Sequence, residues 1–298
     1  MYYSRRMRAI KPKIAFFGTP EFSVKILEAM KNAGFLPGLI ITSPDKPKGR
    51  GRQLSPSPVK VWAEKNNLEI LQPTKLNELQ ITNNELQNAD LFVAASYGKI
   101  LPKEILEIPK YGALNVHPSL LPKLRGPSPI QTAILNNEEK TGVTIMLMNE
   151  KMDEGPILAQ RELEYLISNS QFLNLEEQLA KLGGKLLIET IPKWLKSEIK
   201  PTPQNHSRAT YSKLIAKKDG EINRDEPAEI IERKIRAFTP WPGAYTFYNG
   251  KRIIITKAEL KNDALVIKRV KPEGKNEMEF SEFLKNNPGF SKIISSFG

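Results

Sequence analysis

Cysteine is absent from this sequence of 298 residues, and histidine occurs only twice. The lack of cysteine excludes disulfides and thiolate metal ligands, and it is compatible with a reducing, cytoplasmic setting. Because no cluster of His, Cys, Asp and Glu has metal-ligand spacing, we expect no metal. There is also no apolar run of about eighteen residues, so no segment is expected to span a membrane.

The first twelve residues contain Arg5, Arg6 and Arg8 without an apolar stretch behind them. A secretory signal needs such a stretch after its basic start. We therefore expect residues 1–12 to form a basic tail.

Positive charge is in excess, with 45 Lys and Arg against 33 Asp and Glu and a net charge of +12. Residues 200–298 hold 19 Lys and Arg against 12 Asp and Glu, which gives +7 in the last third. Such an excess favours a polyanionic partner, most often nucleic acid. Solubility alone explains it about equally well, so both readings stay open.

The length exceeds the size at which a single core usually stops growing, so we predict two domains. Continuous apolar runs at 13–17, 39–42 and 90–95 are typical of strands buried on both faces, and amphipathic helices follow them. This alternation predicts a doubly wound, Rossmann-like α/β domain with a mostly parallel sheet over residues 13–199. The absence of a G-x-G-x-x-G motif argues against a dinucleotide cofactor.

A proline-bearing linker is expected at 200–212 because the residues there are polar and Pro-rich. The C-terminal part, 213–298, predicts a helix at 226–238 and then short strands. These strands are expected at 244–248, 252–256 and 264–268, with Asn249-Gly250 as a two-residue hairpin signal. The sequence therefore predicts a small, basic β domain at the C-terminus.

The stretch 111–131 contains the pair that we place at the centre of the protein. Asn115 and His117 are two residues apart, so on an extended chain their side chains point the same way. Pro118 favours an extended conformation at His117. Since His206 lies in the predicted linker, His117 is the candidate for proton transfer near neutral pH, where free histidine titrates at about 6.5.

An acidic turn at 149–156 could supply a carboxylate partner for His117. Either Asp153 or Glu154 could be that partner, and an acidic turn without function is an equal reading of the sequence alone. An amide and an imidazolium can both donate to a developing oxyanion, and a carboxylate can relay a proton from an attacking amine. These groups together would serve direct acyl transfer between two amines.

Two further segments are candidates for ligand contacts. Residues 97–102 follow a predicted strand, and ligands of open α/β sheets bind outside the carboxyl ends of strands. Most aromatic residues in such a position are core residues, and Tyr97 could be one of them. The insert 45–58 places basic side chains among glycines and prolines, which suits a phosphate backbone, although a solvated surface loop has the same composition.

The run Asn115-Val-His-Pro-Ser-Leu-Leu-Pro122 resembles the signature of the folate-dependent formyltransferases, and residues 141–146 with Asp153 resemble its second half. Three more segments, 17–22, 44–60 and 236–243, are similar to the members of that family that act on methionyl-tRNA. The resemblance extends from about Lys13 to the last predicted strand.

This resemblance implies roles for particular residues. Asn115, His117 and Asp153 match the catalytic trio. The donor would be 10-formyltetrahydrofolate, contacted by Ala95, Tyr97, Gly98, Ile100, Leu101, Ser119, Leu120, Leu121 and Pro122. The acceptor would be initiator methionyl-tRNA, bound by the basic C-terminal domain and by Lys46, Lys48, Arg50 and Arg52. The resemblance also implies a monomer.

Two departures from the family pattern stand out. The loop Asp153-Glu-Gly-Pro156 differs from the usual one, so Glu154 could share the role of Asp153. The C-terminal domain is short, which predicts an incomplete or open OB-like barrel and weaker tRNA binding. Two alternatives remain: a formyltransferase for a small amine, such as glycinamide ribonucleotide or an amino-sugar nucleotide, and an RNA-binding protein without catalysis.

Overall fold

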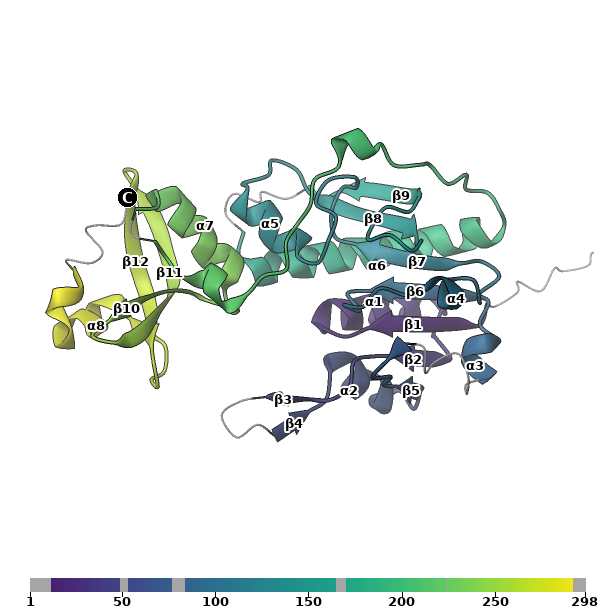
Figure 1. Ribbon diagram of the computed structural model, residues 1–298, viewed down its shortest axis with the longest axis horizontal. Helices are drawn as coiled ribbons and strands as arrows, with labels where there is room; N and C mark the ends of the chain where they lie inside the picture. The colour runs from purple at the N-terminus through teal and green to yellow at the C-terminus, as the bar shows by residue number, and fades with distance from the viewer. Residues whose placement is uncertain (1–11, 49–52, 77–83, 165–169, 224, 292–298) are drawn as a thin grey trace, which may run out of the picture. The chain divides into compact units, whose positions relative to one another are not determined.

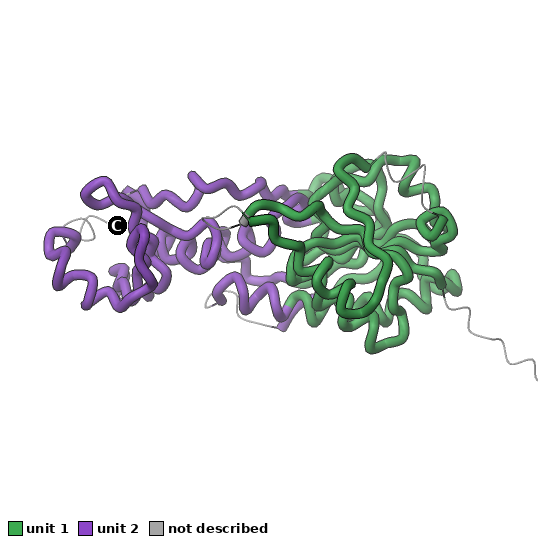
Figure 2. Tube along the Cα trace, turned by 90° about the horizontal axis from the view of Figure 1, so that it is seen from below, with its two compact units in different colours: residues 1–122, 142–161, 179–209 green, residues 123–141, 162–178, 210–298 purple. Residues whose placement is uncertain are grey.

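The computed structural model describes residues 12–48, 53–76, 84–164, 170–223 and 225–291. The chain divides into two compact units, shown in Figure 2. Each unit is discontinuous in sequence: the first comprises 1–122, 142–161 and 179–209, and the second 123–141, 162–178 and 210–298. The sequence predicted an α/β domain at 13–199, a linker at 200–212 and a C-terminal domain at 213–298, and these limits stay a prediction. The two compact units are divided differently, because residues 123–141 and 162–178 belong to the second unit.

A seven-stranded sheet forms the centre of the first unit, in the order β5-β2-β1-β6-β7-β8-β9 (Figure 1). Neighbouring strands from β5 to β7 pair in parallel, and β8 pairs antiparallel with β7. The strands are β1 (Ile14–Gly18), β2 (Leu39–Ile41), β5 (Glu69–Leu71), β6 (Leu91–Ala95), β7 (Ala113–His117), β8 (Gly142–Leu147) and β9 (Ile157–Glu162). The mostly parallel, Rossmann-like α/β fold is thereby confirmed.

The helices of this unit agree with the amphipathic patterns in most cases. They are α1 (Glu21–Asn32), α2 (Pro58–Lys65), α3 (Asn84–Gln87), α4 (Lys103–Leu106) and α6 (Phe172–Leu195), whose first residues belong to the second unit. Residues 77–83, which come before α3, lie outside the described residues. No helix in the described part of the chain is long and apolar enough to cross a membrane.

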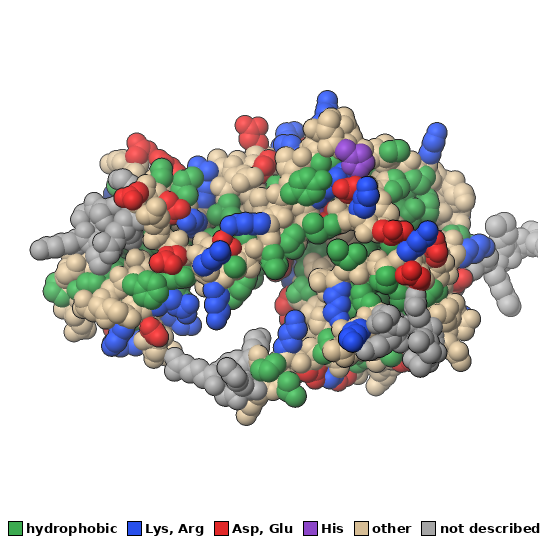
Figure 3. Space-filling model, in the orientation of Figure 1, with side chains coloured by type: hydrophobic (Ala, Val, Ile, Leu, Met, Phe, Trp, Pro, Cys, Tyr) green, Lys and Arg blue, Asp and Glu red, His purple; other side chains and the backbone are tan. Residues whose placement is uncertain are grey.

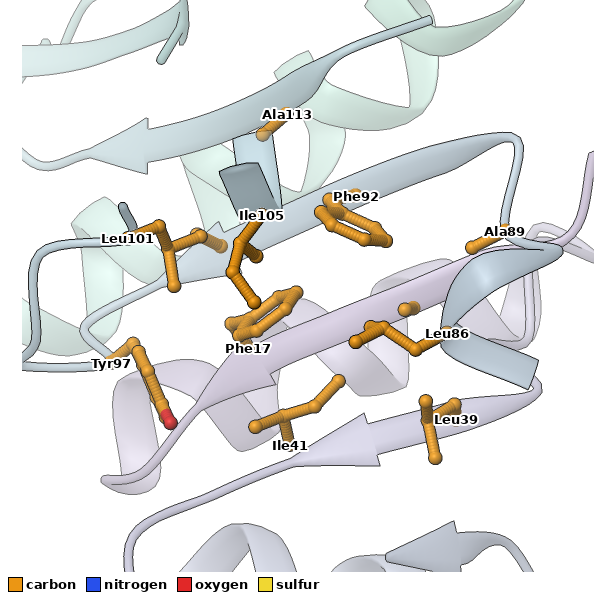
Figure 4. Packing of buried hydrophobic residues seen from close by; sticks show 12 residues of the cluster. Phe17, Leu39, Ile41, Leu86, Ala89, Phe92, Tyr97, Leu101, Ile105 and Ala113 are labelled. Atoms are coloured by element: carbon orange, nitrogen blue, oxygen red, sulfur yellow. The ribbon is translucent and has the colours of Figure 1, made fainter. Parts of the chain in front are cut away.

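Two apolar layers cover the sheet because strand residues alternate between its faces. Phe17 and Phe92 lie on one face in a buried cluster with Leu86 of α3 and Ile105 of α4, as Figure 4 shows. The other face receives α1 and α6. On α6 a Cβ at Gly183 would lie 2.8 Å from Val116 Cγ1, and one at Gly184 would lie 2.7 Å from Ala29 Cβ. Glycine at both positions lets the helix lie directly on the sheet and on α1.

The strand order defines where a ligand can bind. The chain passes from β1 outward to β2 and β5, and then returns to β6 on the other side of β1. Such a reversal opens a crevice outside the carboxyl ends of the two strands on either side of it. The segments that follow β1 and β6 therefore line the expected binding edge of the sheet, and β7, next to β6, ends at the same edge.

The second unit has an antiparallel sheet in the order β10-β11-β12-β13. Its strands are β10 (Ala244–Tyr248), β11 (Lys251–Lys261), β12 (Ala264–Pro272) and β13 (Met278–Glu279), and its helices are α5 (Pro129–Leu135), α7 (Ala228–Phe238) and α8 (Phe280–Asn286). Ile231 and Ile235 of α7 form a buried cluster with Ile253, Ile255 and Val270 of the sheet. Short 3-10 helices of this unit occur at Lys217–Gly220 and Pro288–Phe290, and another, at His206–Arg208, belongs to the first unit.

Two tight turns shape this sheet. Asn249 and Gly250 both have positive φ, and Tyr248 pairs with Lys251, so the predicted two-residue hairpin is confirmed. A second turn at Asn262 and Asp263 also has positive φ at both residues, and it joins two strands that are longer than the sequence indicated. Pairing among the described residues runs from β10 to β13 without joining the two ends, which agrees with an incomplete barrel.

Candidate active site

Strand β7 positions the amide and the imidazole. It is flanked by β6 and β8, with Asn115 opposite Ala94 on one side and Met146 on the other. His117 is the last residue of the strand and is 3% exposed. Because the two residues are two apart in a regular strand, their side chains lie on the same face. Val116 between them points to the opposite face, toward α6.

The carboxylate of Asp153 lies beside both side chains. Its Oδ1 is 3.6 Å from Nδ1 of His117 and accepts a hydrogen bond from Nδ2 of Asn115 at 3.4 Å. The Asp153 side chain is 14% exposed. The structure thus brings together the three residues of the predicted trio. A carboxylate in this position can orient the imidazole ring.

Glu154, the other candidate, points toward different partners. Its carboxylate lies 3.9 Å from Nδ1 of His206 and 3.8 Å from Nζ of Lys151. The two neighbouring acidic residues diverge because Asp153 has a left-handed backbone, with φ of +54°. Of the two acidic residues, Asp153 lies at ion-pair distance from His117.

A buried polar network holds the segment that follows His117. Thr144 of β8, which pairs with His117 in the sheet, donates from Oγ1 to the carbonyl oxygen of Ser119 at 2.7 Å. Thr144 Oγ1 also accepts from the backbone N–H of Leu121 at 3.1 Å and from Nε2 of Gln160 at 2.8 Å. The same Nε2 donates to the carbonyl oxygen of Leu121 at 2.9 Å. These bonds fix the course of the chain after β7.

The loop that carries Asp153 is also closely packed. A Cβ at Gly155 would lie 1.8 Å from the carbonyl oxygen of Leu147, so glycine is required there. The backbone N–H of Leu147 donates to Pro156 at 2.9 Å. The side chain of Gln204 donates to the carbonyl oxygens of Asp153 and Gly155.

The residues predicted to contact folate after β6 are mostly core residues. Ala95, Leu101 and Tyr97 are 0%, 1% and 6% exposed, whereas Ile100 is 62% exposed. Gly98 has a φ of +79°, which suits glycine. In Figure 4 Tyr97 and Leu101 lie beyond the arrowheads of β1 and β6, at the edge of the apolar cluster. Ser96, Gly98 and Ile100 are the exposed residues of this segment.

Tyr97 combines a core ring with an unsatisfied hydroxyl. Its ring packs edge-on against Phe17, with centroids 5.4 Å apart. The hydroxyl oxygen is buried and has no hydrogen-bond partner among the described residues. Burial raises the pKa of Tyr97 to about 12, so the hydroxyl stays protonated. It is a polar group at the binding edge that a ligand could satisfy.

The second group of predicted folate contacts follows β7. Ser119 and Leu121 are 1% and 3% exposed, and Leu120 and Pro122 are half-buried. The side chains of Ser119 and Leu121 therefore pack inward.

The basic insert begins as a short hairpin, β3 (Lys46–Lys48) with β4 (Gln53–Ser55). Lys46 is exposed, while Arg50 and Arg52 lie outside the described residues. Asp45 anchors the start of the hairpin, since it accepts from Gln72 at 2.8 Å and from Lys60 at 2.7 Å. The hydrogen bond from Gln72, and then that from Lys60, lower the pKa of Asp45.

Three polar residues of the site were missed by the sequence reasoning: Thr144, Gln160 and Gln204. Each acts on backbone groups of a loop, and such contacts between distant segments leave no spacing pattern in the sequence. The linker composition around Gln204 concealed it further. Among the described residues no group of three or more His, Asp or Glu side chains is arranged to hold a metal ion.

Comparison with known families agrees with this site and fold. The model of the formyl transferase family matches residues 12–191, and that of the formyl transferase C-terminal domain matches residues 214–264. The chain belongs to the formyltransferase family.

Its curated relatives point to one branch of that family. A methionyl-tRNA formyltransferase of Chloroflexus aurantiacus is 46% identical over 248 residues, which is 83% of this chain and 79% of the relative. One of Myxococcus xanthus is 38% identical over 311 aligned positions, covering 96% of this chain and 99% of the relative.

Solved structures share the fold. An N-formyltransferase from Helicobacter canadensis, in complex with folinic acid and dTDP-3-aminofucose, has a TM-score of 0.62 and 21% identity over 85% of this chain and 89% of its own.

Proposed function

We propose that this protein transfers a formyl group from 10-formyltetrahydrofolate to the amino group of methionyl-tRNA. The observation that carries the proposal is the meeting of Asn115, His117 and Asp153 at the carboxyl end of β7, within 3.6 Å. The family membership and the names of relatives at 38% and 46% identity support the acceptor. A small amine as acceptor is not favoured, because these relatives are named for methionyl-tRNA.

The trio has the groups that direct formyl transfer needs. The amide of Asn115 has two N–H groups, of which one is directed to Asp153, so the second can donate to the formyl oxygen as negative charge develops there. An imidazole N–H of His117 adds a second donor. Asp153 holds the imidazole and accepts the proton that the attacking amine must lose. The new C–N bond to the methionyl amine then replaces the C–N bond to the folate nitrogen, which takes up a proton.

The donor, when bound, supplies an acyl group already activated for attack by an amine. We infer that it binds at the edge formed by residues 95–101 and 119–122. The orphan hydroxyl of Tyr97 and the exposed side chain of Ile100 support this placement. A folate derivative in the Helicobacter canadensis relative supports the class of donor.

The acceptor is a polyanion, and its proposed binding surfaces are basic. Lys46 is exposed on the insert. Strands β11 and β12 carry Lys251, Arg252, Lys257, Lys268, Arg269 and Lys271. Figure 3 shows Lys and Arg side chains close together over the part of the molecule that carries β10–β12. We further infer a cytoplasmic monomer, as expected of an enzyme that acts on charged tRNA.

The test is formylation of methionyl-tRNA by a His117→Ala variant. We expect its turnover to fall by about 10²- to 10⁴-fold, the usual contribution of a general acid or base, while tRNA binding measured by filter retention stays within about twofold. His206→Ala, which removes the other histidine, serves as the matched control and should keep full activity. Full turnover by His117→Ala would refute the role of His117 in the proposal, and tRNA binding by the native protein without any formylation would favour an RNA-binding protein without catalysis.

A further inference from the structure

A buried glutamine holds the loop that carries Asp153. Gln204 is 6% exposed, although it lies in the polar segment between α6 and the second unit. Its Nε2 donates to the carbonyl oxygen of Asp153 at 2.8 Å and to that of Gly155 at 2.7 Å. A carboxamide nitrogen carries two N–H groups, and these two bonds account for both.

The backbone of this glutamine is itself fixed by the sheet. Two residues earlier, Thr202 forms an isolated antiparallel bridge with Ile157, the first residue of β9. The N–H of Thr202 donates to Ile157 at 2.9 Å, and the N–H of Ile157 donates to Thr202 at 2.8 Å. Gln204 is therefore held on the sheet side of the loop, independently of Asp153.

The loop depends on this support because its geometry is demanding. Asp153 has a φ of +54°, a left-handed conformation that is uncommon outside glycine, asparagine and aspartate. Without the glutamine donors the buried carbonyl of Gly155 would lose its hydrogen bond, which favours rearrangement of the loop. The contacts of Asp153 with His117 and Asn115, at 3.6 and 3.4 Å, are already long, so a small shift of the loop would break them.

We propose that Gln204 is a positioning residue for formyl transfer, acting through Asp153. This inference rests on the proposed function of the trio. Gln204 contacts the backbone of the Asp153 loop, so its loss should lower the rate of the chemical step and leave the binding of donor and acceptor nearly unchanged.

The first test is Gln204→Met, which keeps the length of the side chain and removes both donors. We expect kcat to fall by about 10- to 100-fold, since a misplacement of about 1 Å has effects of this size, with KM for both substrates within about twofold. Asn205→Ala is the matched control, because the Asn205 side chain accepts hydrogen bonds from Ser207 on the neighbouring turn and should not affect kcat.

A double-mutant cycle distinguishes positioning from general structural support. If Gln204 acts through Asp153, Gln204→Met should change the rate of an Asp153→Asn variant by less than about twofold. A loss of the full size in the Asp153→Asn background would overturn the proposal, as would a normal kcat for Gln204→Met. Wild-type activity of Asp153→Asn would instead contradict the proposed function of the trio.

A second variant keeps the proposal testable if Gln204→Met does not fold, as judged by circular dichroism and thermal midpoint. Gln204→Glu has the shape of the native side chain and regains one donor when its carboxyl group is protonated. We expect its kcat, relative to that of the native protein, to recover toward low pH. A ratio that is independent of pH, or a normal kcat throughout, would overturn the positioning role.

Discussion

The side chain of Asp153 reaches His117 because a single residue takes a left-handed backbone conformation, with φ of +54°. The sequence showed the acidic turn but not which carboxylate faces inward, since no spacing rule states which of two neighbours takes positive φ. The relative orientation of Asn115 and His117 could be predicted, because residues two apart in an extended strand point to the same face. Strand periodicity is local information, whereas the loop conformation depends on Gly155 and Gln204.

Tyr97 shows a second limit at the residue scale. Its place after a buried strand put it at the binding edge, but the sequence could not separate a ligand contact from a core aromatic. The structure shows features of both, with the ring in the apolar cluster and the hydroxyl buried without a partner. The sequence also could not show that Ala95 and Leu101 are buried, since apolar residues at the end of a strand can be either buried or exposed.

Replacing Tyr97 with Phe should raise the free energy of unfolding by about 1 kcal/mol at neutral pH, because it removes an unsatisfied buried hydroxyl. The pKa of Tyr97 is raised to about 12, so between pH 10 and 12 the folded state retains a proton that the unfolded state releases. As the pH rises from 10 to 12, this group therefore lowers the free energy of unfolding by about 1.4 kcal/mol per pH unit, and below pH 10 it causes no such change. Urea denaturation at pH 9 and 11 measures the difference.

The native protein should lose more stability than Tyr97→Phe between those two pH values, and an equal loss in both proteins would contradict the burial of the hydroxyl. Steady-state kinetics of the same variant test its role in binding. An increase in KM for 10-formyltetrahydrofolate alone would support a contact between this hydroxyl and the donor.

At the scale of elements, apolar runs and turn residues gave most of the information. Strands β1 and β6 are buried along their full length, as their continuous apolar sequences predicted. The Asn249-Gly250 hairpin followed from its turn chemistry. The longer hairpin of β11 and β12 was missed because its outer residues are polar and exposed, so only backbone pairing identifies them as strand. Strand β9 was also missed, since its exposed side chains interrupt any apolar run.

The basic hairpin of β3 and β4 carries a prediction about tRNA binding. Lys46→Ala should weaken binding of tRNA and reduce the slope of log K against log salt concentration by about 1, because one phosphate contact is lost. Binding titrations at several salt concentrations measure the slope. Lys185→Ala removes an equal charge from the exposed face of α6 and is the matched control. Equal slopes for the two variants would argue against a contact at the insert.

At the scale of the whole molecule, the sequence suggested a division at a proline-bearing linker, and contact units instead interleave three segments each. Helix α5, which follows β7 in sequence, packs against α7 within the second unit. Arg233 of α7 donates to the carbonyl oxygen of Leu135 at 3.4 Å, and Arg236 to that of Ser170 at 3.0 Å. These contacts join residues 98 and 66 positions apart, so composition along the chain cannot reveal them.

A chain cut after Ala209 should therefore not behave as an independent catalytic domain. It would lack α7 and uncover apolar residues of α5, including Ile130 and Ile134, which are 5% and 0% exposed. We expect the fragment to bind the dye ANS more strongly than the whole protein and to lose its cooperative thermal transition. Polar substitutions at Ile130 and Ile134 should reduce the dye binding. A monomeric fragment with a sharp transition would show that the linker does separate two independent folding units.

Helix α6 contains two residues that intrinsically disfavour a helix. Glycine in a helix interior lowers stability by about 1 kcal/mol relative to alanine, so Gly183 and Gly184 together oppose the helix by about 2 kcal/mol. Alanine at 183 would press on Val116, which stands in the strand between Asn115 and His117. The space that Val116 occupies on one side of the sheet, between the two candidate catalytic residues, thus depends on the absence of a methyl group on α6.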